Sequence, residues 1–251
     1  MDIQNPADYW ENRLKKNYGL DGTGFITLGI SYNKWMYKMR RQVVIREVRS
    51  LGIDYSQASI LDVGSGTGFY LEIWKQLGCG KLSGIDITYI AIENLGKKYP
   101  QYEFLKADIG DNLDKSFNLF STTYDIISSL DVLFHIVEDE RYRRAFQNIY
   151  DLLRPGGIFI FSENFLHKDS IRSPYQTSRS LSEIEDIVRK TGFKILKRSP
   201  FFVLMNNPVD TNSPLLSTHW KLTTRCIRKG AKLGYIIGAF LYILSSISNG
   251  Y

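Results

Sequence analysis

Short apolar runs alternate with amphipathic stretches along most of the chain. The runs have the length of buried strands, and between them the apolar positions recur at helical spacing. We predict strands at 59–63, 81–87, 102–107, 124–130, 157–163 and 193–198, with helices at 69–77, 88–99, 138–153 and 180–191. Strands that alternate with helices of about a dozen residues indicate βαβ units. The expected fold class is therefore α/β, with a mostly parallel sheet flanked by helices.

Helices are also predicted on both sides of this pattern. Four are expected, at 7–17, 32–50, 217–229 and 231–247. The glycine-rich stretch 20–31 is predicted to be a mobile loop, and 201–214 is predicted to be a loop near the substrate. The chain is thus expected to divide into an N-terminal lid (1–58), an α/β core (59–200) and a C-terminal extension of basic and apolar helices (201–251).

A glycine-rich loop follows the first predicted strand. Asp62 comes directly before the loop, which contains Gly64, Ser65, Gly66 and Gly68. Glycines between a strand and a helix let a ligand approach the backbone, where the free N–H groups of the helix point at it. A dinucleotide site usually has its last glycine one position later. An acid before the loop favours a ligand with a positive centre.

Two more acids lie where predicted strands end. Ligands of parallel sheets bind at the carboxyl ends of the strands. Asp86 is placed to accept hydrogen bonds from ribose hydroxyls, and Asp108 from an exocyclic amine. Either acid is alternatively a helix N-cap, and for Asp86 both roles are compatible.

Five motifs in this order, ILDVGSGTGFY, GIDI, KADI, YDIISSLDVLFHI and LLRPGGIFIFSE, resemble those of the class I S-adenosylmethionine-dependent methyltransferases over residues 59–163. The resemblance implies a Rossmann-like fold and S-adenosyl-L-methionine as cofactor. It further implies that the glycine loop with Asp62 holds the methionine part and that Asp86 holds the ribose. The remaining contacts that it implies come from Ile87, Asp108, Ile109 and Leu130.

The N-terminal helices resemble the lid helices of small-molecule methyltransferases. The candidates for substrate or lid contacts are Tyr9, Trp10, Tyr32 and Tyr37. Aromatic residues at helical spacing are alternatively core residues. Arg40 is a candidate for holding a carboxylate, such as that of the cofactor, and is otherwise a surface charge.

His135 is the candidate catalytic residue because it follows the fourth predicted strand, near the expected position of the methyl group. A hydroxyl nucleophile needs its proton removed. The alternative role for His135 is structural. We therefore expect methyl transfer to a small-molecule or glycan-like acceptor, most simply at oxygen. N- or C-methylation in natural-product biosynthesis and a non-catalytic cofactor-binding subunit are the alternatives.

Composition changes the picture mainly at the C-terminus. The 251-residue chain has a formal charge of +6, of which residues 201–251 contribute +4, from five basic residues and Asp210. The nearly balanced remainder argues against a nucleic-acid partner. Cys79 and Cys226 are far apart and the histidines lack metal-ligand spacing, so no metal site is expected. With no apolar run at the start, a cytoplasmic protein is expected.

The predicted helix 231–247 has an apolar face. Its members are Leu233, Ile236, Ile237, Phe240, Leu241, Leu244 and Ile247. Basic residues just before an amphipathic helix are typical of contact with an anionic membrane, which predicts peripheral membrane contact through 221–247. Packing on the core or on a homodimer partner is the alternative, and we favour it.

Overall fold

The computed structural model describes residues 5–248, apart from the side chains of Asp21 and Ser248. Residues 1–4 and 249–251 lie outside the described residues, and the predicted segments 1–58 and 201–251 extend into them. The chain divides into two compact units. The first comprises Met1–Lys15 and Asp54–Leu196, and the second comprises Lys16–Ile53 and Lys197–Tyr251.

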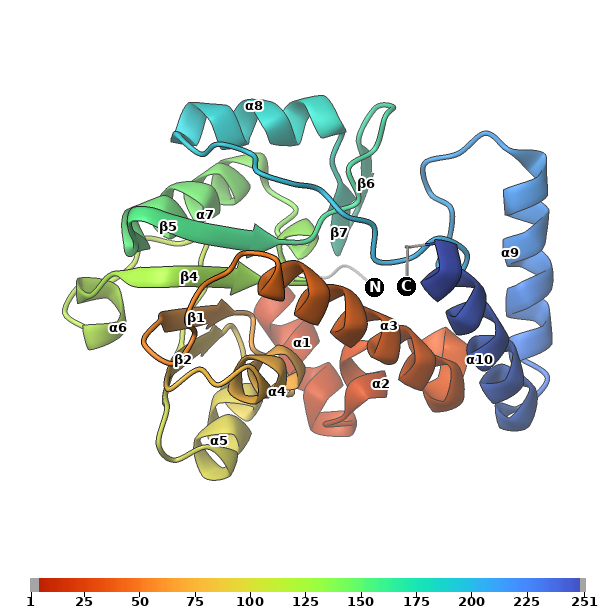
Figure 1. Cartoon of the computed structure of the whole chain (residues 1–251), viewed down its shortest axis with the longest axis horizontal. Helices are drawn as coiled ribbons and strands as arrows, with labels where there is room; N and C mark the ends of the chain where they lie inside the picture. The colour runs from red at the N-terminus through yellow and green to blue at the C-terminus, as the bar shows by residue number, and fades with distance from the viewer. Residues whose placement is uncertain (1–4, 249–251) are drawn as a thin grey trace. The chain divides into compact units, whose positions relative to one another are not determined.

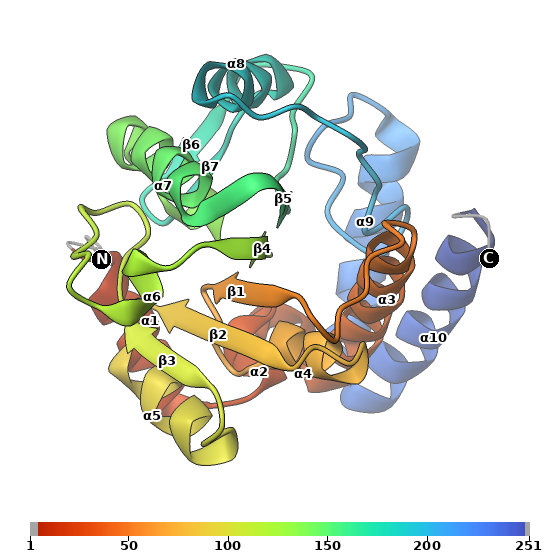
Figure 2. The ribbon, with the colours of Figure 1, turned by 60° about the vertical axis from the view of Figure 1, so that its left-hand side comes forward.

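The first unit contains a five-stranded parallel sheet (Figure 2). The strands are β1 (Ser59–Val63), β2 (Lys81–Asp86), β3 (Glu103–Lys106), β4 (Tyr124–Ser129) and β5 (Leu153–Phe161). Their order is β3-β2-β1-β4-β5, so the direction of winding reverses between β1 and β4. This confirms the predicted α/β fold, and it places the ends of β1 and β4 at the switch point where such sheets bind ligands.

The helices of the first unit lie close to the predicted ranges. They are α1 (Pro6–Lys16), α4 (Phe69–Gln76), α5 (Tyr89–Lys98), α6 (Asn118–Ser121), α7 (Asp139–Leu152) and α8 (Leu181–Thr191). The four-residue helix α6, a 3-10 turn at Leu133–His135 and an antiparallel hairpin, β6 (Ile171–Ser173) with β7 (Gln176–Ser178), were not predicted. These short elements lack the long periodic pattern that makes an element recognisable in a sequence.

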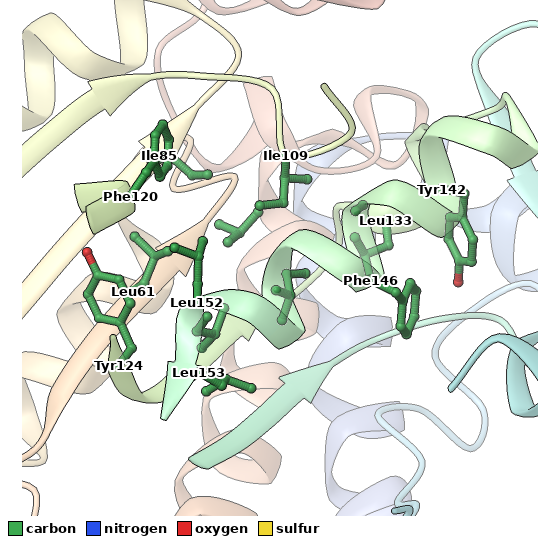
Figure 3. Close-up of a cluster of buried hydrophobic side chains, with 14 of the residues drawn as sticks. Leu61, Ile85, Ile109, Phe120, Tyr124, Leu133, Tyr142, Phe146, Leu152 and Leu153 are labelled. Atoms are coloured by element: carbon green, nitrogen blue, oxygen red, sulfur yellow. The ribbon is translucent and has the colours of Figure 1, made fainter. Parts of the chain in front are cut away.

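The core of this unit lies between the sheet and helices α7 and α8. Leu61 of β1 and Ile85 of β2 belong to one buried cluster with Tyr142, Phe146 and other residues of α7 (Figure 3). The helix supplies apolar residues at positions three and four apart, all of them buried. Because one face of α7 packs against the strands, the ends of β1, β2 and β4 are held in a fixed arrangement.

Two predictions about strands are wrong. Residues 193–198 form no strand: Phe193 packs beside Phe159 and Tyr150, but Ile195 and Leu196 are 45% and 70% exposed. With one of three apolar side chains partly buried and the other two exposed, there is little to offset the entropy of ordering a sixth strand. The predicted start of the fifth strand at residue 157 is also wrong. Strand β5 begins at Leu153, because Leu153 already pairs with Tyr124 before an irregularity at the glycines.

The second unit is helical. It contains α2 (Leu20–Thr23), a 3-10 turn at Ile26–Leu28, α3 (Gly29–Arg49), α9 (Pro214–Ile227) and α10 (Ala231–Ser248). The expected loop at 20–31 is therefore wrong, since it forms helical turns. Asn33 explains the order: its Nδ2 donates to the carbonyl oxygens of Phe25 and Gly29, and its Oδ1 accepts from the Phe25 N–H. A side chain eight residues away stabilises the turns that the glycines would leave loose.

Helix α10 packs along α3 in this unit (Figure 1). A Cβ on Gly238 would lie 2.6 Å from the Trp35 ring, so the glycines allow a close approach of the helices. The buried residues of α10 are Gly234, Gly238, Leu241 and Ser245. The predicted apolar face is correct in part as a packing face. Leu241 is buried, and Ile237 and Leu244 pack against the same core. Ile236, Phe240 and Ile247, by contrast, are 53%, 60% and 65% exposed. Within residues 5–248, no helix is both long and apolar enough to cross a membrane.

Candidate functional site

The glycine loop leaves the end of β1 and runs to the start of α4. Gly64, Gly66 and Gly68 have φ values of +75°, +52° and +82°, a region that other residues rarely adopt. A Cβ on Gly64 would lie only 2.3 Å from a methyl group of Val132. The N–H groups of Gly64 and Ser65 donate to the carbonyl oxygen of Ile85, at 2.8 and 3.0 Å. The loop is thus fastened to the end of β2.

Asp62 lies beneath this loop and is buried. Its Oδ1 accepts a hydrogen bond of 2.7 Å from the Ser128 hydroxyl. Among the described residues, none donates a hydrogen bond to Oδ2. Burial raises the pKa of Asp62 to about 7. A buried carboxylate with an oxygen left unpaired favours a cationic ligand, since a positive charge would offset the cost of desolvation.

Asp86 has its hydrogen-bond partners on both sides of the β2 end. Oδ2 accepts from the Gly66 N–H at 2.8 Å, and Oδ1 accepts from the Thr88 N–H and hydroxyl. Thr88 itself is the N-cap of α5 and accepts from the Ala91 N–H. The N-cap alternative for Asp86 is therefore wrong. Asp86 instead orders the cap and the glycine loop, and burial raises its pKa.

Asp108 is paired with a cation of the chain. Its Oδ2 accepts a hydrogen bond of 2.6 Å from Arg141 of α7, and its Oδ1 accepts one from the Gly110 N–H. These contacts give Asp108 a structural role in the turn after β3, and a contact with an exocyclic amine stays a prediction. Ile109 and Leu130 are buried, whereas Ile87 is half-buried.

Asp131 follows β4 with a φ of +61°, which is uncommon for a residue other than glycine. The conformation is fixed by a hydrogen bond from the Asp131 N–H to the Ser162 hydroxyl, at 2.7 Å. Its Oδ2 accepts from the Tyr70 hydroxyl at 2.6 Å. Strained backbone of this kind clusters at functional sites. The sequence motif at the end of the fourth strand includes Asp131, but the candidate set lacks Tyr70.

His135 ends the 3-10 turn after β4 and is half-buried. Its Nδ1 lies 2.9 Å from the backbone carbonyl oxygen of Tyr175, in the turn between β6 and β7. Because a carbonyl oxygen only accepts, the ring proton is at Nδ1 and the neutral imidazole keeps its lone pair on Nε2. Burial lowers the pKa of His135, which favours this neutral form.

Helix α1 contacts two regions of the first unit, namely the start of α5 and the surroundings of His135. Glu11 accepts hydrogen bonds from the backbone N–H groups of Tyr89 and Ile90, at 2.7 and 3.3 Å, at the start of α5. The Trp10 ring packs edge-on against His135, with centroids 4.9 Å apart. Tyr9 stacks near Tyr175 at 6.4 Å. Tyr9 and Trp10 therefore lie beside the candidate base.

The other N-terminal candidates belong to the second unit. Tyr32 is fully buried in its core and donates to the Met205 carbonyl oxygen, while Tyr37 is buried and its hydroxyl bonds that of Thr23. The Arg40 guanidinium lies over the rings of Tyr37 and Phe202. Arg40 is buried, so the surface-charge alternative is wrong. The packing gives all three a structural role, and their contacts with cofactor or substrate stay predictions.

A buried polar network at the end of β5 carried no recognisable signal in the sequence. Glu163 accepts a hydrogen bond of 2.8 Å from the Tyr142 hydroxyl, and burial raises its pKa to about 7. The guanidinium of Arg179 lies 3.6 Å from the centroid of the Tyr142 ring and pairs with Asp139 at 3.0 Å. These residues come from three separate elements, so only the fold brings them together.

Residues 60–157 match the family described as a methyltransferase domain. Two curated relatives align more broadly. An uncharacterized methyltransferase of Oceanobacillus iheyensis is 28% identical over 60% of this chain and 63% of its own length. A tRNA N(3)-methylcytidine methyltransferase of Schizosaccharomyces pombe is 25% identical over 78% of this chain and 66% of its own length. The chain thus spans less than two thirds of either relative.

Solved structures show the same fold. A magnesium protoporphyrin IX methyltransferase from Synechocystis, solved with bound SAM, superposes with a TM-score of 0.57 at 16% identity. The match covers 80% of this chain and 95% of that one. One curated relative is thus named for a tRNA, and the solved structure is named for a porphyrin. The shared fold therefore does not specify the acceptor.

Proposed function

We propose that the chain, whose residues 60–157 match a methyltransferase domain, is a class I S-adenosylmethionine-dependent methyltransferase, and that it transfers a methyl group from S-adenosyl-L-methionine to a hydroxyl group of a small-molecule or glycan-like acceptor. The observation that carries the proposal is the unpaired, buried Oδ2 of Asp62 beneath the glycine loop. A cationic donor group would both satisfy that oxygen and offset the cost of burying the charge.

The residues that would hold the cofactor surround the ends of β1 and β2. Asp62 would pair with the positive methionine part, the glycine loop would lie against it, and Asp86 would accept from the ribose through lone pairs not used by Gly66 and Thr88. Ser65, Ile87, Ile109 and Leu130 are proposed to line the site. When bound, S-adenosylmethionine supplies an electrophilic methyl group on a positively charged sulfur.

His135 is proposed to act as the general base. The acceptor hydroxyl would donate its proton to Nε2, while the Tyr175 carbonyl oxygen holds the Nδ1 proton and orients the ring. Proton removal by a positioned base contributes typically 10²–10⁴-fold to a rate. An amine nucleophile would need a base much less, so the tautomer of His135 supports transfer to oxygen.

The rings beside His135 support an acceptor with a flat or sugar-like face. Tyr9, Trp10 and Tyr175 form an aromatic group within the first unit. Rings of this kind provide apolar area with a polar edge. Held against them, the acceptor hydroxyl would be aligned for transfer, and alignment alone contributes several kcal/mol.

Isothermal calorimetry with the whole chain tests the cofactor. We expect saturable binding of S-adenosylmethionine and no binding of NAD under the same conditions; the opposite preference would overturn the proposal.

Transfer of a labelled methyl group to a panel of phenols and glycans, each paired with its amine analogue, tests the acceptor. If only the phenols or glycans become labelled, the result supports transfer to oxygen. If only the amines become labelled, the result contradicts it.

A further inference from the structure

Helix α10 has two different faces. The packed face contains the buried residues Gly234, Gly238, Leu241 and Ser245, whereas the exposed face is a stripe of Ile236, Phe240, Ile243 and Ile247. These residues recur at intervals of four, three and four, so they lie within one narrow sector of the helix. Each is 53–65% exposed. At 1.5 Å per residue the stripe is roughly 16 Å long.

Basic residues accompany this stripe. Lys232 lies one turn before Ile236 in the same sector, and Lys221, Arg225, Arg228 and Lys229 belong to α9 and the turn that follows it; all five are exposed. Helix α9 packs against α10 and exposes Leu215 and Leu222 as well. After Asp210 the sequence contains no further acid. This surface therefore combines apolar and cationic groups.

The charge of the whole second unit points the same way. Its sequence contains 14 Lys and Arg against 3 Asp and Glu, a formal charge of +11. The first unit therefore has a formal charge of −5, because the chain total is +6. The positive charge is thus a property of the helical unit that includes α3, beyond the C-terminal residues alone, and it favours an extended anionic partner.

We propose that the surface of α9 and α10 binds an anionic lipid bilayer, with α10 lying in the plane of the interface. The stripe from Ile236 to Ile247 would enter the boundary between headgroups and acyl chains, while Lys232 and the basic residues of α9 would contact lipid phosphates. Neither feature alone is enough. Together they match the two requirements of an interfacial helix.

Two other occupants fit this surface less well. RNA would satisfy the basic residues but would gain little from a row of isoleucine side chains. A second copy of the chain would cover the stripe, yet it would bring two strongly basic units together, which costs electrostatic free energy. An anionic bilayer gains from both the apolar and the cationic groups.

Sedimentation of the full chain with vesicles tests the proposal. We expect binding to vesicles of phosphatidylcholine with about a third phosphatidylglycerol, and at least about tenfold weaker binding to pure phosphatidylcholine. Binding should weaken as salt rises, because ions screen the attraction. Equal binding to both vesicles, or no binding to either, would overturn the proposal.

Variants separate the two contributions. Ile236→Ser with Phe240→Ser should lower vesicle binding by more than about tenfold, since both side chains would lose burial in the bilayer. Arg225→Glu with Lys229→Glu should lower it at least as much. The matched controls are Leu196→Ser and the pair Lys115→Glu with Lys168→Glu, which alter exposed residues of the first unit. Controls that lose binding equally would contradict the proposal.

Two further measurements complete the test. Circular dichroism and thermal unfolding should match the wild type for every variant, because all the altered residues are exposed. Analytical ultracentrifugation should give a monomer for both the wild type and Ile236→Ser with Phe240→Ser. A wild-type dimer that this variant dissociates, with no vesicle binding, would assign the surface to a second copy and overturn the proposal. Binding of RNA in place of vesicles would overturn it as well.

Discussion

The two halves of the candidate site are built differently, although both lie at the carboxyl edge of one sheet. Around β1 and β2, the glycine loop and the carboxylates of Asp62 and Asp86 are fixed by backbone N–H groups and neighbouring hydroxyls. Around β4, His135 is fixed by a carbonyl oxygen of the β6–β7 turn and by an aromatic ring of α1. One half depends on neighbours in the sheet, and the other on distant segments.

This difference matches the two ligands of a methyl transfer, the cofactor and the acceptor. The first half offers an anionic site in which Oδ2 of Asp62 has no hydrogen-bond partner among the described residues, which suits a cationic cofactor. The second half is a group of rings and one neutral imidazole, which suits an acceptor that differs between proteins. We therefore expect substitutions in the two halves to change different measurable quantities.

The largest effect is expected from His135→Ala. Without the base, kcat should fall by about 10²–10⁴-fold, while the Kd for S-adenosylmethionine changes less than about twofold. In the wild type, kcat should be constant at neutral pH and fall only in acid, since burial lowers the pKa of His135 and the protonated ring accepts no proton. Steady-state kinetics with calorimetry measure both quantities.

His167→Ala is the matched control, because His167 is an exposed histidine of the same unit. It should leave kcat within about twofold of the wild type, as surface substitutions usually do. An unchanged kcat in His135→Ala would show that His135 is not the general base. An equal fall in both variants would assign the effect to something other than the base.

A smaller effect is expected from Gly64→Ala. The new Cβ would meet Val132 at 2.3 Å in a backbone with positive φ, so the loop must shift. The Kd for S-adenosylmethionine should rise by about 100-fold, roughly the 2–3 kcal/mol of an overpacked site. Gly78→Ala, where φ is +88° and nothing lies within 4 Å, introduces the backbone strain alone. Similar losses in both variants would contradict the proposed close approach.

The smallest effect is expected from Tyr70→Phe. It removes the hydrogen bond that links α4 to Asp131 and so connects the two halves. The free energy of unfolding should fall by about 1.5–3 kcal/mol, as for a hydrogen bond to a charged group. Tyr102→Phe is the control, since Tyr102 is half-buried and its described side-chain contact is with a ring. Denaturant unfolding distinguishes them, and equal stabilities would contradict a linking role for Tyr70.

The cofactor half could be predicted because its residues follow one another in the sequence. Strand β1 and the loop at 64–68 are one continuous motif, and Asp86 ends the next strand. The bond from His135 to Tyr175 joins residues forty apart through an unpredicted hairpin. The hydrogen bond from Tyr142 to Glu163 likewise joins residues that are distant in the sequence. A single sequence carries no signal for such pairings.

The direction of α10 shows a second limit. Hydrophobic periodicity identified the helix and its apolar sector, but it did not reveal which edge of that sector packs. Gly238 allows α10 to approach Trp35 of α3 closely. One edge of the sector, with Ile237, Leu241 and Leu244, packs in the core, whereas the other edge, with Ile236 and Phe240, is exposed.

The binding of S-adenosylmethionine as a function of pH tests the central claim most directly. Burial raises the pKa of Asp62 to about 7, so the carboxyl is protonated below that pH and loses its attraction for a cation. We predict that the affinity of the wild type falls up to about tenfold per pH unit between about pH 7 and 5.5. Asp62→Asn should bind more weakly and without this dependence. Equal affinities, or the same pH profile in both proteins, would contradict the account.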